Sequence, residues 1–119
     1  APPPPPGARF EVDGAGYASV NGVYGIDPGI KEWNKRALYK KLKPDGTFYN
    51  PGGSDRGMCV IWHSDSWCFH GCTPDPDAGN GPDNDNPYKR DGDTARPPET
   101  GWVRYSSCGA EPMPTVRWL

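Results

Sequence analysis

The sequence predicts a small all-β fold, an antiparallel sandwich or barrel with long loops, linked by disulfides and preceded by a polyproline II arm. The apolar fraction is only 34%, but five Trp, six Tyr and three Phe are enough to build a small aromatic core. Gly and Pro, 16 of each, are typical of a chain with many turns. Four cysteines in such a chain indicate the disulfide framework of a small secreted domain.

The N-terminal arm, residues 1–9, contains five consecutive prolines. Proline fixes φ and lacks an amide donor, so this segment is expected to form an extended polyproline II rod. The composition fits a spacer, and it also fits a recognition element that lies along an aromatic groove. Residues 10–119 are expected to form a single β domain. The prolines of the arm are Pro2, Pro3, Pro4, Pro5 and Pro6.

Turn signals divide the first part of this domain into strands. Residues 10–25 predict two strands separated by the Gly-Ala-Gly turn at 14–16. A nucleotide-binding loop at this turn would need a following helix, which the sequence does not supply. Residues 37–49 predict a hairpin that turns at Pro44-Asp45-Gly46, in preference to a helix over residues 30–42. The basic side chains at 35–43 are expected on its solvated face.

Residues 58–72, the densest apolar and cysteine-bearing run, predict the central β-hairpin. With Asp65-Ser66 as a two-residue tip, Cys59 faces Cys72 at a Cα separation of about 4.5 Å, which suits a disulfide. A three-residue tip would place Cys59 opposite Gly71 instead. Alternation along both strands predicts one apolar face, formed by Val60, Trp62, Trp67 and Phe69.

Residues 73–98 read as a long polar loop insertion, and loops of this length are usually functional or mobile. Its aspartates resemble calcium ligands in type. However, Asn80 and Asn86 stand where an EF-hand loop requires Gly and Glu, so a solvated acidic loop is the preferred interpretation. Residues 101–105 and 114–118 predict closing strands. The aspartates are Asp75, Asp77, Asp83, Asp85, Asp91 and Asp93.

Several function classes receive no support from the sequence. The net charge of −2 argues against nucleic-acid and anionic-membrane partners, and no apolar run is long enough for a membrane span. Ser64 and Ser66 lie beside His63 and Asp65 on a hairpin tip, but no oxyanion donor is implied, so no enzyme is predicted.

No cofactor and no metal are predicted either. Cysteine and histidine side chains on one face of the central hairpin have the residue types of a zinc site, but the outer members are too far apart to share an ion. Only a subset could do so: His63, Cys68 and His70.

Two resemblances suggest where such a chain acts. The proline tract is similar to those of hydroxyproline-rich cell-surface glycoproteins, in which prolines are hydroxylated and O-glycosylated. A second pattern resembles a Trp/Gly-rich β module of extracellular proteins of algae and other protists. It comprises V-D-G-A-G and V-N-G-x-Y between Val12 and Tyr24, then Tyr39, Trp62, Trp67 and Gly101-Trp102, and G-x-x-P-x-P-T-V from Gly109 to Val116.

We interpret the chain as a structural subunit of an extracellular glycosylated assembly. Copies are expected to join head to tail into a filament through the proline arm, because a rod with free carbonyls and built-in order loses little chain entropy when it docks. Glycans are expected on the hydroxylated prolines, because no asparagine is followed by Ser or Thr two residues later. The groove for the arm is assigned to Trp102, Tyr105 and Trp118. The alternative is a carbohydrate-binding module of a cell-surface or secreted protein, because exposed aromatic rings on a sheet can stack on sugars.

We predict two disulfides, Cys59–Cys72 across the hairpin and Cys68–Cys108 between the hairpin and the closing strands. Replacing Cys68 should destabilise the protein more than replacing Cys72, because its disulfide closes the longer loop. Peptide mapping under non-reducing conditions tests the pairing, and free thiols or a Cys59–Cys68 link would contradict it.

Overall fold

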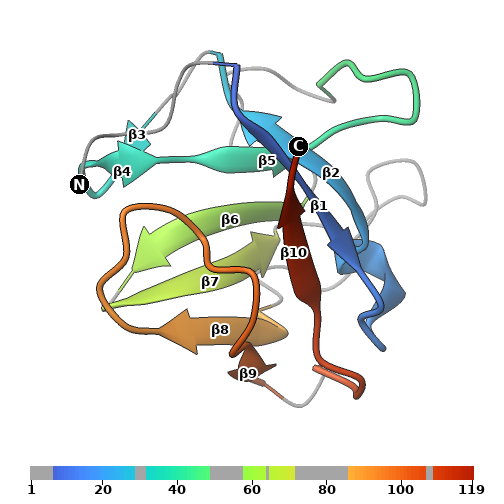
Figure 1. Cartoon of the computed structure of the whole chain (residues 1–119), viewed down its shortest axis with the longest axis vertical. Coiled ribbons are helices and arrows are strands. Elements are labelled where there is room, and N and C mark those ends of the chain that lie inside the picture. Colours follow the sequence, from blue (N-terminus) through green and yellow to red (C-terminus); the bar gives the residue numbers. More distant parts are fainter. Residues whose placement is uncertain (1–6, 29–31, 49–57, 64, 72–85, 107–108) are drawn as a thin grey trace.

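The computed structural model describes residues 7–28, 32–48, 58–63, 65–71, 86–106 and 109–119. Within these ranges the protein is all-β, with one antiparallel sheet in the order β10-β1-β2-β5-β6-β7-β8-β9 and a separate two-stranded sheet of β3 and β4 (Figure 1). The strands are β1 (Arg9–Asp13), β2 (Gly22–Ile26), β3 (Glu32–Trp33), β4 (Arg36–Ala37), β5 (Tyr39–Lys41), β6 (Met58–His63), β7 (Ser66–Gly71), β8 (Tyr88–Asp91), β9 (Val103–Arg104) and β10 (Thr115–Trp118).

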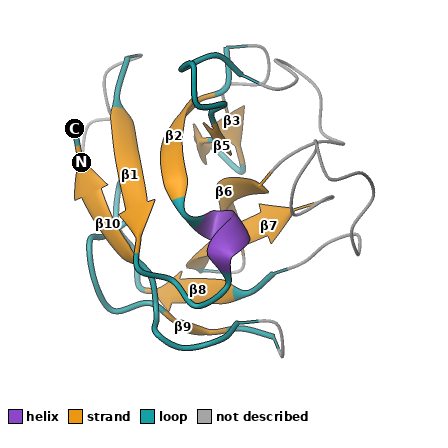
Figure 2. Cartoon of the chain, turned by 90° about the vertical axis from the view of Figure 1, so that its right-hand side faces the viewer, coloured by secondary structure: helices purple, strands orange, loops and turns teal. Residues whose placement is uncertain are grey.

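The large sheet curls into a half-barrel, which brings its β1–β10 edge close to its β8–β9 edge (Figure 2). The Tyr88 hydroxyl joins the two edges, because it accepts a hydrogen bond from the Tyr17 N–H at 2.9 Å and donates one to the Ala110 carbonyl. The chain also comes very close at Gly16, where an added Cβ would lie 2.2 Å from the Glu111 carbonyl oxygen. Only glycine fits there.

The first predicted strand is confirmed as β1, and the second is confirmed from Gly22 onward as β2. β1 pairs with β2, and Gly14 adopts a φ of +74° in the turn after β1. A single 3₁₀ turn, η1 (Ala18–Val20), precedes β2. In the described ranges no helix has the length and apolarity to cross a membrane. The hairpin predicted over residues 37–49 appears as β5 followed by a bridge between Leu42 and Phe48.

The central hairpin is confirmed, but its predicted register is wrong by one pair of residues. His63 pairs with Ser66, so the tip lies at residues 64–65, with Asp65 in the left-handed region at a φ of +64°. Cys59 therefore faces His70, and neither Cys72 nor Gly71. A shift of two positions keeps every side chain on its predicted face. The apolar face is accordingly the one that enters the core.

Two further predictions are corrected by the observed strands. Residues 73–98 are not loop throughout, because β8 lies within them and pairs with β7. Residues 32–37 form the small hairpin of β3 and β4, whereas the sequence predicted a strand only from residue 37 onward. Its turn residues Asn34 and Lys35 have φ values of +53° and +68°, as a tight hairpin turn requires.

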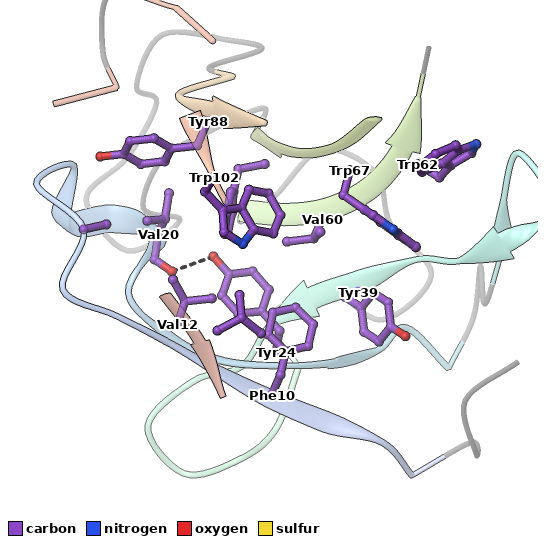
Figure 3. Packing of buried hydrophobic residues seen from close by; sticks show 13 residues of the cluster. Phe10, Val12, Val20, Tyr24, Tyr39, Val60, Trp62, Trp67, Tyr88 and Trp102 are labelled. Atoms are coloured by element: carbon purple, nitrogen blue, oxygen red, sulfur yellow. Dashed lines mark hydrogen bonds between the residues drawn. The ribbon is translucent and has the colours of Figure 1, made fainter. Parts of the chain in front are cut away.

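The core is mainly aromatic and lies inside the half-barrel (Figure 3). Phe10 and Tyr24 stack with ring centroids 5.1 Å apart, and Phe69 packs at 4.8 Å from Trp102. The Tyr24 hydroxyl donates to the Val20 carbonyl at 2.8 Å, so this buried polar group is satisfied. The fully buried large side chains are Phe10, Tyr24, Tyr39, Trp67, Phe69 and Tyr88.

Lys40 departs from the expected solvated basic face. Its side chain is 5% exposed and its Nζ lies 3.0 Å from Oδ2 of Asp27, which is fully buried. Lys40 lies on the outer side of the sheet, where Ile61 and Cys68 are also buried. This part of the outer side is therefore shielded from solvent. A buried charge is tolerated only beside its partner, so this ion pair links β5 to the segment that follows β2.

We predict that Lys40→Met destabilises the protein by about 3–5 kcal/mol, because it leaves the Asp27 carboxylate buried without its counter-charge. The double variant D27N/K40M should recover much of this loss, since no charge then remains. Chemical denaturation monitored by Trp fluorescence measures both, with Lys43→Met as the matched control. Equal losses for Lys40→Met and Lys43→Met would contradict the prediction.

Candidate functional site

Residues 94–98, here called the strap, are bound by the tryptophans of the half-barrel. Trp118 on β10 donates its indole N–H to the Pro97 carbonyl at 3.1 Å, and Trp102 donates to the Pro98 carbonyl at 2.9 Å. Pro97 is buried. Proline segments are recognised in this way elsewhere, because their carbonyls are free to accept and their rings pack against aromatic side chains.

The other end of the strap is fixed at Thr94. Trp67 on β7 donates its indole N–H to the Thr94 hydroxyl at 3.0 Å and to the Thr94 carbonyl at 3.2 Å. Arg36 on β4 donates to the same carbonyl and forms an ion pair with Asp93 at 2.6 Å. The strap therefore connects β7 with β10 through side-chain hydrogen bonds.

Two arginines stack on tryptophan rings at this end of the molecule. The Arg36 guanidinium lies 3.8 Å from the centroid of Trp62, and that of Arg96, in the strap, lies 4.4 Å from Trp118. Each contact is a cation–π interaction. Burial raises the pKa of Tyr39, which the Arg96 charge partly offsets. The Tyr39 hydroxyl has no hydrogen-bond partner among the described residues, so it stays protonated inside the aromatic cluster.

The small β3–β4 hairpin presents the most exposed aromatic ring of this region. Trp33 is 47% exposed and pairs across the hairpin with Arg36. The hairpin is attached to the sheet by Asn34, whose side-chain amide donates to the Trp62 carbonyl at 2.9 Å. A tryptophan face beside the Arg36–Asp93 ion pair combines an apolar surface with hydrogen-bonding groups, as a sugar ring requires.

The three residues assigned to the self-association groove do not form one surface. Trp102 is 3% exposed and packs on Phe69, and Trp118 packs on Phe10 with its N–H already bound to the strap. Tyr105 is 46% exposed and follows β9. Of the three, Tyr105 alone offers a large free surface in the described part of the chain.

The structure describes only two of the four cysteines of the predicted disulfides. Cys72 and Cys108 lie outside the described residues, so both disulfides remain predictions, and the register no longer supports Cys59–Cys72. The structure contains no disulfide between Cys59 and Cys68. The Cys59 thiol donates to the His70 carbonyl at 3.0 Å. Burial raises the pKa of Cys68 to about 11, which makes its thiol a poor nucleophile near neutral pH.

The other candidate groups are placed apart or engaged with neighbours. Asp91 accepts a hydrogen bond from the Ser66 hydroxyl, which lowers the pKa of Asp91, so this hydroxyl is bonded to strand β8. His70 contacts Asn86 through Nδ1 at 2.7 Å. Within the described ranges no three Asp, Glu, His or Cys side chains are grouped to hold a metal ion. Outside these ranges lie the following predicted residues: Pro2, Pro3, Pro4, Pro5, Pro6, Ser64, Asp75, Asp77, Asp83 and Asp85.

Comparisons with protein-family models, curated proteins and solved structures find no match to this chain. The two resemblances noted in the sequence therefore remain hypotheses. Sequence reasoning missed both the strap and the Trp33 hairpin. The signal for the first was Arg96-Pro97-Pro98, a proline pair inside a segment read as polar loop. The signal for the second was Asn34, a residue that tolerates the left-handed conformation of a tight turn.

We predict that Trp118→Phe destabilises the protein by about 1–3 kcal/mol, because the buried Pro97 carbonyl loses its donor while most of the ring packing is kept. Trp33→Phe is the matched control and should change stability by less than about 0.5 kcal/mol, since Trp33 is exposed. Urea unfolding of both variants gives the comparison. A Trp118→Phe variant as stable as the control would show that the indole N–H does not hold the strap.

Proposed function

We propose that the protein is a structural subunit of an extracellular glycosylated assembly, with copies joined head to tail through the proline arm. The observation that carries the proposal is the strap. Two indole N–H groups already bind the carbonyls of Pro97 and Pro98 of the same chain. The chain thus recognises proline carbonyls within its own fold, and residues 2–6 supply a second proline segment for the same kind of contact between copies.

The position of the arm also supports this function. The Leu119 N–H donates to the Arg9 carbonyl at 2.9 Å, so the arm enters β1 beside the residue that follows β10, at one end of the half-barrel. A rod that starts at one end of a body and binds a different surface of the next copy makes a heterologous contact. Such contacts propagate into rings or filaments.

Glycosylation of the arm is part of the proposal. Five consecutive prolines offer successive attachment points once hydroxylated, on a rod that has no internal hydrogen bonds to disturb. Hydroxyl and pentose or hexose increments in the mass of the N-terminal peptide of native protein are the corresponding observation. An unmodified peptide would remove glycans from the proposal.

The second candidate function is carbohydrate binding, and Trp33 favours it. Its ring is 47% exposed on a hairpin that Asn34 and Arg36 hold against β6. A pyranose could stack its C–H face on the indole, whose π face is electron-rich. Asp93 and Arg36 would supply hydrogen bonds to the sugar hydroxyls.

The assembly function predicts that replacing Pro2–Pro6 with a Gly/Ser segment of equal length abolishes association of the full chain. The replacement keeps the reach of the arm but removes its order and its proline rings, so docking would cost more chain entropy. Analytical ultracentrifugation and electron microscopy measure the outcome. Assemblies identical to those of the wild type would exclude the arm as the connector.

The binding function makes a separate prediction for Trp33. Neutral oligosaccharides should bind at millimolar concentration or better, and Trp33→Ala should weaken binding at least about tenfold through loss of the stacking surface. Tyr105→Ala serves as the control with an equally exposed ring and should bind as the wild type. NMR or calorimetric titration decides, and absence of binding by the wild-type chain rejects this function.

A further inference from the structure

We propose that strand β9 and its outer face, formed by Val103, Tyr105 and Lys89, are the surface on which the proline arm of a second copy docks. This inference rests on the assembly proposed above and names its receptor. It differs from the groove expected from the sequence, because the strap already occupies the indole N–H groups of Trp102 and Trp118. Of the three residues assigned from the sequence, only Tyr105 belongs to the proposed surface, together with Val103 and Lys89.

The first support is the free edge of the sheet. β9 is the last strand in the order, and in the described ranges no strand pairs with its outer side. Tyr105 donates its N–H to the Pro87 carbonyl at 2.9 Å, and Lys89 pairs with Val103. Ladder bonds alternate along an antiparallel strand, so the N–H and carbonyl of Arg104 point away from β8, toward this edge. The edge thus presents a backbone donor.

The second support is the character of the outer face. Val103 is 45% exposed and Tyr105 is 46% exposed, and their spacing by two residues places both side chains on the same side of β9. The Lys89 ammonium lies 5.5 Å from the centroid of the Tyr105 ring and 3.4 Å from Asp91. The result is a small apolar and aromatic platform on which the Lys89 charge is paired with Asp91.

A polyproline rod matches these groups. Its pyrrolidine rings can pack against Tyr105 and Val103, and its carbonyls can accept from the Arg104 N–H and the Tyr105 hydroxyl. A rod of this kind has no amide donors of its own, so it needs donors on its partner. The strap shows part of this combination within one chain, because indole N–H groups donate to the Pro97 and Pro98 carbonyls.

The distance between β9 and the point where the arm begins favours docking of the arm from a second copy over docking of the chain's own arm. Figures 1 and 2 show β9 at the opposite end of the half-barrel from the C-terminal end of β10. The arm continues into β1 at Arg9, whose carbonyl accepts a hydrogen bond from the Leu119 N–H beside that C-terminal end. Six residues of polyproline II span roughly 19 Å, whereas the longest extent of the molecule is 35 Å. The arm is therefore shorter than the molecule, which favours the β9 of a neighbouring copy as its partner.

The test uses the full chain in three forms. In the first, Tyr105 is replaced by the photocrosslinker p-benzoylphenylalanine. In the second, the same group replaces Trp33, which is equally exposed but lies on the β3–β4 hairpin. The third is Tyr105→Ala, whose surface position keeps the fold intact, as circular dichroism verifies. Crosslinked peptides are identified by mass spectrometry, and association constants come from sedimentation.

We expect position 105 to crosslink to residues 1–8 of another copy and position 33 to give no such adduct. Tyr105→Ala should weaken association at least tenfold. If the Gly/Ser arm variant abolishes association but position 105 gives no arm adduct, the receptor assignment is wrong while the assembly function stands. If association survives loss of the arm, both the receptor assignment and the assembly function are wrong. Adducts of position 105 to folded parts of a neighbour, or to glycan alone, also overturn the assignment.

Discussion

Donation of indole N–H groups to backbone carbonyls is the interaction on which this fold most depends. An eight-stranded sheet in a chain of 119 residues does not close on itself here, so its aromatic inner face needs further cover. The strap supplies it between β7 and β10, held by Trp67 at one end and Trp118 at the other. Buried carbonyls without donors would destabilise such a cover, and three tryptophans satisfy them.

The same interaction connects the fold with the proposed function. A proline segment has carbonyls but no N–H groups, so any surface that binds it must combine donors with flat apolar area. The body meets this need internally with the strap. At its β9 end it presents a smaller version of that combination, in which the Arg104 N–H and the Tyr105 ring face outward. The N-terminal end of β1, where the arm begins, and β9 lie at opposite ends of the half-barrel, which would give a repeating contact a direction.

Local patterns in the sequence predicted the strands well, and long-range contacts account for most of what was missed. Alternation placed Trp62 and Trp67 correctly on the core face, and this survived an error of two in the register, because the period of a strand is two. The error arose at the tip, where Asp65 adopts a left-handed conformation that an Asp-Ser pair does not signal. Lys40 looked solvent-exposed because its partner, Asp27, is distant in sequence. Nothing local indicated that Trp118 would bind Pro97, so two of the three residues assigned to the groove, Trp102 and Trp118, already have partners within the chain.

Electron cryo-microscopy of the assembly formed by native protein tests the central claim most directly. The account predicts density for the proline arm of each copy running along β9 of the next, in contact with Tyr105, with the strap still bound to Trp118 within each body. Density in which the copies touch through other surfaces while the arm projects into solvent would contradict it. So would a native protein that remains monomeric at the concentrations at which it is isolated.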